Sequence, residues 1–175
     1  MPRSLADGKT KVTILPTAPA DPKAITLTEL EAGIDASCAI LAGDYNVTAA
    51  TSETVDEKAL CQEGNASTWG ASNGTIEFTL FLEFNDQHQL DLESDAGKAF
   101  EAVKHKGTEV YIVQRESSKG SKEDWAAGDE YEYFHGIADN PAHVDRTGYV
   151  KRKITAAFQD MELHGVVTGD DTPEG

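Results

Sequence analysis

Histidine and cysteine are the residue types in this chain best suited to metal binding or nucleophilic chemistry. Of the five histidines, His135 and His143 are the pair most able to converge, because the turn at Asp139 lies between them and could add a carboxylate. The alternative is a histidine on a half-exposed strand, which is the commoner situation. Cys38 and Cys61 form no C-x-x-C pair, so we expect two free thiols in a reducing cytosol.

Acidic side chains crowd the segment from Asp86 to Asp95 and could bind calcium weakly. The alternating aspartate spacing of a calcium-binding loop is absent there, which favours a solvated acidic turn. The chain also contains no G-x-x-x-x-G-K phosphate-binding loop. We therefore predict a protein that is not an enzyme, with no catalytic residues, no bound metal or cofactor, and no small-molecule substrate.

The strongest compositional feature is the charge. The 175 residues include 15 Lys and Arg against 31 Asp and Glu, which gives a formal net charge of −16. Such a chain repels polyanions over ~8–10 Å at ordinary salt, which disfavours ordinary nucleic-acid binding. A surface that must stay near DNA without binding it fits this charge, and so does a merely soluble protein. No apolar run approaches the ~20 residues of a membrane span, so we expect no membrane contact.

The elements that must position these side chains are predicted to be mostly strands. Residues 75–84 alternate between apolar and mostly polar positions, as expected for a sheet covered on one face. Phe81 interrupts the polar face of this strand and could meet another element or another subunit. Further strands are expected at residues 37–41, 44–55, 108–115, 129–138, 148–158 and 161–168.

One substantial helix is predicted at residues 94–104. Its apolar residues recur at helical spacing, and Ser94 or Asp95 provides the N-cap. The spacing of Thr28 and Glu31 also predicts a capping box for one short helical turn. The predicted fold is therefore mainly β, a β-sandwich or partial barrel with one flanking α-helix.

The chain is predicted to contain one domain with two extensions. Residues 1–22 are expected to form an extended N-terminal arm, because three prolines at every third position disfavour helix or central strand. Residues 23–168 form the domain, and residues 169–175 form an acidic C-terminal tail. Within the domain, the 56–74 connection is a long loop and Ser117–Lys122 is a flexible hairpin tip.

A basic run in this acidic chain is the first candidate for contacts between subunits. Lys151, Arg152 and Lys153 follow one another on the predicted strand 148–158, which follows the acidic strand 129–138 along the chain. This arrangement predicts strands that pair selectively, within one chain or between copies of it. The alternative is a solvated basic face.

Aromatic residues are the second group of candidates. Trp69 lies in the long loop and Trp125 follows the flexible tip, and tryptophan is favoured at the buried centre of interfaces. Phe81 is the third member of this group. The alternative is that both tryptophans cover the ends of the core.

Four groups of segments, spread over roughly residues 11–167, carry a resemblance through their combination. They are the run Ile25–Cys38, the run Leu60–Asn65, the helix leading into Lys106–Val113, and Asp139–Pro141 followed by Gly148–Lys151. Together they resemble the major tail (tail tube) proteins of long-tailed, non-contractile (siphovirus-type) bacteriophages, notably those that infect actinobacteria.

The resemblance implies a structural virion protein with a β-sandwich and a flanking helix. Such subunits form closed rings, typically of six, and the rings stack into a tube around a tape-measure protein. DNA later passes through the lumen without specific binding. The implied partners are further copies of the chain, the tape-measure protein and other tail proteins, and the implied location is the virion tail, assembled in the cytoplasm of the bacterial host.

Two other functions fit parts of the pattern. One is a carbohydrate- or receptor-binding β-sandwich that uses Trp69 and Trp125 as stacking platforms. The other is a different virion component of similar fold, such as a tail terminator or a decoration protein. The copy number per virion distinguishes a tube protein from such a component, because a tube stacks many rings whereas a terminator forms one.

Overall fold

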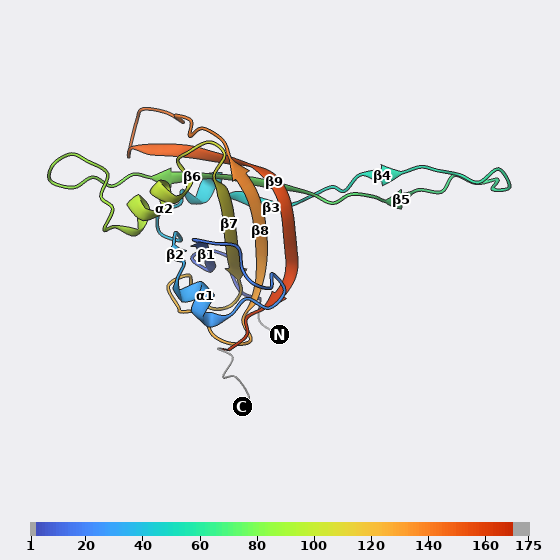
Figure 1. Ribbon diagram of the computed structural model, residues 1–175, viewed down its shortest axis with the longest axis horizontal. Helices are drawn as coiled ribbons and strands as arrows, with labels where there is room; N and C mark the ends of the chain where they lie inside the picture. The colour runs from blue at the N-terminus through green and yellow to red at the C-terminus, as the bar shows by residue number, and fades with distance from the viewer. Residues whose placement is uncertain (1–2, 170–175) are drawn as a thin grey trace.

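The computed structural model describes residues 3–169, and its centre is one antiparallel sheet of seven strands in the order β2-β1-β7-β8-β9-β6-β3 (Figure 1). A separate pair, β4 with β5, lies outside this sheet. The strands are β1 (Thr10–Leu15), β2 (Ile34–Asp35), β3 (Asn46–Ala50), β4 (Thr54–Val55), β5 (Thr68–Trp69), β6 (Asn73–Phe81), β7 (Glu109–Glu116), β8 (Glu130–Ala138) and β9 (Lys151–Val166). The helices are α1 (Leu27–Glu31) and α2 (Asp95–Val103), with a 3-10 turn η1 (Ala42–Asp44). The prediction of a mainly β fold is confirmed.

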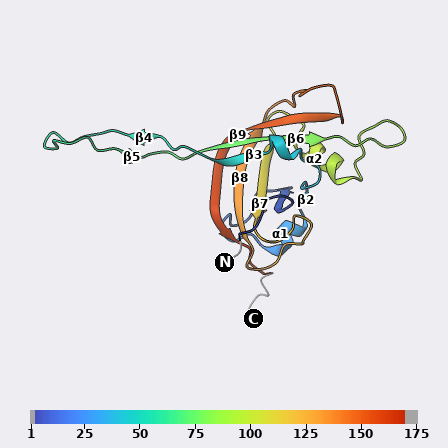
Figure 2. The same ribbon diagram turned by 180° about the vertical axis from the view of Figure 1, so that it is seen from behind.

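Strand β9 gives the sheet its curvature. Its first half, up to Ala156, pairs with β6, and its second half pairs with β8. Two register shifts, between Tyr131 and Tyr133 and between His135 and Gly136, each insert one extra residue on β9. Such bulges bend a strand and increase its twist, and Figures 1 and 2 show β9 turning sharply along its length. The sheet therefore curls, without closing into a barrel.

The larger hydrophobic core lies inside this curl. Strands from both ends of the sheet contribute to it, and α2 adds small residues on its inner face. The large side chains that are almost fully buried there include Phe78, Ile112, Phe134 and Ile154. Burial of each such side chain stabilises the fold by ~1.5–3 kcal/mol, so this core holds the bent sheet in one shape.

A second core covers the opposite face of β7 and β8. Tyr111, Val113, Tyr131 and Tyr133 pack there with residues from α1 and its flanking segment. The central strands β7 and β8 are thus buried on both faces, unlike the one-sided cover predicted for residues 75–84. The two-sided cover arises because the chain between β1 and α1 folds back across the sheet, which alternation within one strand does not reveal.

Both helices begin with side-chain caps. The Ser94 hydroxyl of α2 accepts the Gly97 N–H at 3.0 Å, which confirms one of the two predicted caps. Glycine is needed at that position, since a Cβ on it would lie 1.8 Å from the Asp91 carbonyl oxygen. Helix α1 has the expected type of capping box, but it is formed by Thr26 and Glu29, two residues earlier than predicted.

Three predicted elements have other bounds or another form in the structure. Part of the expected N-terminal arm, Thr10–Leu15, is strand β1 inside the sheet, because the prolines follow this strand and end it. Residues 37–41 form no strand and make only an isolated bridge to β6. The strands expected at 148–158 and 161–168 are one long strand, β9. Most of the acidic tail lies outside the described residues.

Candidate functional site: the projecting hairpin and the free strand edge

Residues 51–72, here called the projecting hairpin, leave the sheet between β3 and β6 and extend far from the body of the molecule (Figures 1 and 2). Strands β4 and β5 pair within it, and its hydrogen bonds join it to itself or to Asn73. Val55 and Leu60 are exposed large apolar side chains, and Trp69 is 69% exposed. The long loop predicted for this region is therefore a ribbon that exposes large apolar side chains to solvent.

The second half of β9 is a free strand edge. Residues 157–165 pair with β8 on one side, and no strand within residues 3–169 pairs with them on the other. The Met161 N–H donates to its neighbour Asp160 at 2.8 Å, and the His164 N–H donates to Glu162 at 3.1 Å. Side chains thus occupy backbone donors that a further strand could use, and such an edge can accept a strand from another chain.

The basic run of β9 lies away from this edge. Lys151, Arg152 and Lys153 pair with β6, whereas acidic β8 pairs with the second half of β9. Lys153 Nζ lies 3.6 Å from Glu77, and Lys151 Nζ lies 3.1 Å from Asp145. The two strands pair within one chain, as predicted, but the basic run faces β6 and not the acidic residues of β8. A role of the basic run between subunits stays a prediction.

The three aromatic candidates have different surroundings. Trp125 is partly buried, and its indole N–H donates to the Thr13 hydroxyl at 2.9 Å. Phe81 meets Tyr149 edge to face, with ring centroids 5.9 Å apart. Trp69 alone is largely exposed. Two of the three therefore have partners within the chain, and the indole of Trp69 has the most surface to offer.

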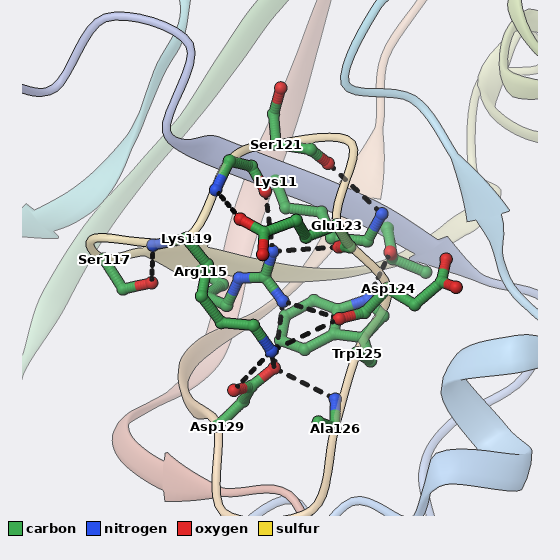
Figure 3. A network of polar contacts seen from close by, with 12 residues as sticks. Lys11, Arg115, Ser117, Lys119, Ser121, Glu123, Asp124, Trp125, Ala126 and Asp129 are labelled. Carbon is green, nitrogen blue, oxygen red and sulfur yellow. Dashed lines mark hydrogen bonds and ion pairs between the residues drawn. The ribbon is translucent and has the colours of Figure 1, made fainter.

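Arg115 organises the loop that follows β7, and sequence reasoning did not identify it. Its side chain is 1% exposed, and its guanidinium donates to three backbone carbonyls of that loop at 2.9, 3.0 and 3.1 Å (Figure 3). It also forms an ion pair with Asp129 at 2.9 Å and lies 5.1 Å from the ring centre of Trp125. The predicted flexible tip at Ser117–Lys122 is therefore held to the body. The sequence feature that could have indicated this role is an arginine near the end of an apolar strand.

Asp129 is the anionic centre of this network. Its carboxylate accepts hydrogen bonds from Lys119 Nζ and from the Ala126 N–H, both at 3.0 Å (Figure 3). Burial raises the pKa of Asp129, but the hydrogen bonds from Lys119, Ala126 and Arg115 lower it by more, so the pKa falls below its ordinary value. The ionised carboxylate offsets the buried charge of Arg115.

A polar cleft of about 580 Å³ lies where β3 meets the ends of β7 and β8. The Tyr45 hydroxyl donates to Gln114, whose amide donates to Glu132 at 2.6 Å and to the Val47 carbonyl at 3.1 Å. Burial raises the pKa of Tyr45, and the nearby carboxylates of Glu132 and Glu116 raise it further. This network ties β3 to β7 and β8, so it fixes the base from which the projecting hairpin leaves the sheet.

The histidines and cysteines form no reactive group. His135 stacks on Tyr111 with ring centroids 4.8 Å apart, and His143 lies in the exposed connection after β8. Within residues 3–169, no three His, Cys, Asp or Glu side chains gather as a metal site. Cys38 and Cys61 are unpaired and exposed.

One motif that sequence reasoning overlooked is Gly70-x-Ser72-x-Gly74, which has the spacing of a serine nucleophile elbow. An elbow places its serine on a strand-to-helix turn, whereas Ser72 lies exposed at the base of the projecting hairpin, directly before β6. Gly74 has a packing reason, since a Cβ there would lie 2.5 Å from the Phe158 ring. The spacing therefore reflects packing at the root of a hairpin.

The described part of the chain contains no helix that is both long and apolar enough to pass through a membrane. A curled sheet, a free strand edge and a projecting ribbon characterise this mainly β protein. The chain belongs to the phage tail tube protein family, whose match covers residues 1–170. It is thus a structural protein of the phage tail tube and a component of the virion tail. No curated protein matches the chain.

Proposed function

We propose that this protein assembles with copies of itself into stacked rings, with six copies in each ring, which form the tube of a long non-contractile tail. The observation that carries the proposal is the free edge of β9 at residues 157–165, beside a sheet that is already curved. Pairing of this edge with a strand of the next copy would satisfy its backbone groups and continue the curl. A closed ring of such sheets leaves no free edge in its wall.

The lumen of such a tube encloses the tape-measure protein first and conducts DNA during ejection. The net charge of −16 on each subunit supports this role, since an acidic wall repels phosphates over ~8–10 Å. DNA then passes without specific binding. Further tail proteins meet the ends of the tube, and assembly takes place in the cytoplasm of the bacterial host.

The proposed contacts between subunits use the exposed candidates. Trp69 on the projecting hairpin supplies apolar surface, and the basic run Lys151–Lys153 supplies charge that complements acidic neighbours. Phe81 and Trp125 contribute indirectly. Phe81 packs against Tyr149, and Trp125 packs against Arg115, which holds the loop after β7. A carbohydrate-binding module has less support, because the Trp125 indole is already engaged by Thr13.

Negative-stain microscopy of the concentrated protein tests this proposal, and we expect rings or tubes. The edge itself is tested by His164→Pro, because the His164 N–H donates to the Glu162 side chain and proline removes this backbone donor from the edge. The variant should melt within a few degrees of His164→Ala and form no tubes. A wild-type protein that stays monomeric at every concentration, even beside its tail partners, would contradict the proposal.

A further inference from the structure

Residues 143–153, here called the basic loop, form a positive and partly apolar surface in an acidic protein. They carry four Lys and Arg residues against one carboxylate, and only Lys151 and Lys153 have ion-pair partners within residues 3–169. The guanidinium of Arg152, followed by that of Arg146, lowers the pKa of His143, which reflects the local positive potential. Arg146 and Arg152 are therefore cations without a carboxylate partner in the described chain.

The basic loop also contains a hollow. Its volume is about 200 Å³, enough for one branched apolar side chain, and its walls include Arg146, Tyr149, Val150 and Arg152. Tyr149 is 81% exposed, and Val150 is exposed as well. Phe81 meets one side of the Tyr149 ring edge to face, which leaves the rest of the ring open to a ligand. Exposed apolar walls beside unpaired cations suit a ligand that is both apolar and acidic.

The projecting hairpin has this complementary composition. It carries Glu53, Asp56, Glu57 and Glu63 against the single cation Lys58. Leu60 lies at its tip between two of these carboxylates and is fully exposed. An extended arm over residues 51–61 spans ~35 Å at ~3.3 Å per residue, long enough to cross from one subunit to another.

The two surfaces lie on opposite sides of the body of the molecule. Strand β6 leaves the projecting hairpin at Asn73 and ends at Phe81, which pairs with Lys151 at the basic loop. Figures 1 and 2 show the hairpin at one end of the long axis and the start of β9, with the connection before it, on the far side of the body; the segment between β6 and α2 reaches the other end. The hairpin of a chain cannot reach its own basic loop. A contact between them joins two copies head to tail, and such contacts repeat as an open chain.

We propose that the basic loop of one copy is the docking site for the tip of the projecting hairpin of another copy. Leu60 enters the hollow beside Tyr149, and the carboxylates of Glu57 and Glu63 face the guanidinium groups of Arg146 and Arg152. The inference rests on the proposed tube, since it assigns the contact that links copies along the tube axis. Both surfaces combine apolar groups with charge, which favours a protein partner over a nucleic acid.

Disulfide trapping tests the contact, because Cys61 stands beside Leu60 at the tip and is exposed. A Cys38→Ser, Tyr149→Cys variant is assembled and treated with a mild copper oxidant. We expect a ladder of linked copies on a non-reducing gel, since a disulfide forms only when the two Cα atoms lie within ~7 Å. Gln87→Cys in place of Tyr149→Cys is the matched control, on the exposed turn before α2, and should give no ladder.

A charge swap gives an independent readout. Arg146→Glu alone, and Glu57→Arg with Glu63→Arg, should each lower the amount of sedimentable tube roughly tenfold at low salt, as expected for the loss of a close charge pair. Combining the three substitutions should restore most of it. All of these positions are exposed, and unchanged melting temperatures confirm folded subunits.

The possible failures are distinguishable. If the wild-type protein forms no tubes, the proposed function fails first. If tubes form but show neither the disulfide from Cys61 to the Tyr149→Cys thiol nor rescue by the swap, the docking contact is overturned and the tube proposal stands. The contact is also overturned if Arg146→Glu assembles normally while losing affinity for a short DNA duplex, because the basic loop would then be a nucleic-acid site.

Discussion

Two long connections of this chain contrast sharply. The segment between β7 and β8 folds back on the body, where the buried guanidinium of Arg115 donates to its carbonyls and pairs with Asp129. The projecting hairpin has bonds only to itself and its root, and its large apolar side chains lie in solvent. One connection is stabilised by contacts with its own chain, and the other leaves its large apolar groups exposed. A buried anchor is therefore what distinguishes the two.

The largest expected effect comes from removal of that anchor. Arg115→Met should destabilise the protein by ~3–5 kcal/mol, because it removes the buried guanidinium from its ion pair with Asp129 and leaves three loop carbonyls without that donor. Denaturant unfolding measures the change. The matched Arg146→Met variant, in the exposed basic loop, should stay within ~0.5 kcal/mol of wild type. Equal changes in the free energy of unfolding for the two variants would show that Arg115 does not anchor its loop more strongly than an exposed arginine does.

A leucine pair extends the comparison to apolar groups. Leu80→Ala in β6 should cost ~2–5 kcal/mol, since that side chain is fully buried in the main core. Leu60→Ala at the hairpin tip should change the free energy of unfolding by less than ~0.5 kcal/mol, since it is fully exposed. Thermal melts of the dilute, unassembled protein provide the measurement. A marked loss of stability in Leu60→Ala would show that the hairpin packs on its own body.

The smallest expected effect depends on pH. The pKa of Asp129 lies below its ordinary value of about 3.9, so the carboxylate stabilises the loop at every pH above that value. This contribution is lost as the pH falls below ~4 and through the folded pKa, where the carboxylate takes up a proton. Amide hydrogen exchange should show residues 117–128 losing protection over this range, and Asp129→Asn should abolish the dependence. The projecting hairpin serves as the internal reference.

Local features were predictable because neighbouring residues determine them. Helix α2 follows from an apolar stripe and the Ser94 cap, and β6 follows from the alternation of Ile76, Phe78 and Leu80. The family resemblance also came from short segments. The capping box of α1 was displaced by two residues, since Thr26 and Thr28 both precede a glutamate at the required spacing.

The candidate surfaces were only partly predictable. The sequence identified Trp69 and the 56–74 segment as candidates for contacts. It did not show that they lie on a ribbon that projects from the sheet. The role of Arg115 was not predictable, because the carbonyls that it binds lie in a loop whose composition is typical of a flexible segment. The bend of β9 was not predictable either, because its two bulges depend on the register in which it pairs with β8.

The sequence by itself determined the acidic charge, the strand and helix periodicities and the composition of the basic and acidic segments, since these depend on residue type and near neighbours alone. The tertiary structure decided which strand edge stays free, which loop is anchored, and that the basic loop and the acidic hairpin tip lie on opposite sides of the body. Those outcomes depend on strand register and on burial between residues far apart in the chain. Long-range pairing of that kind is a property of the whole folded molecule, and it places the basic loop and the acidic hairpin tip far apart on the surface.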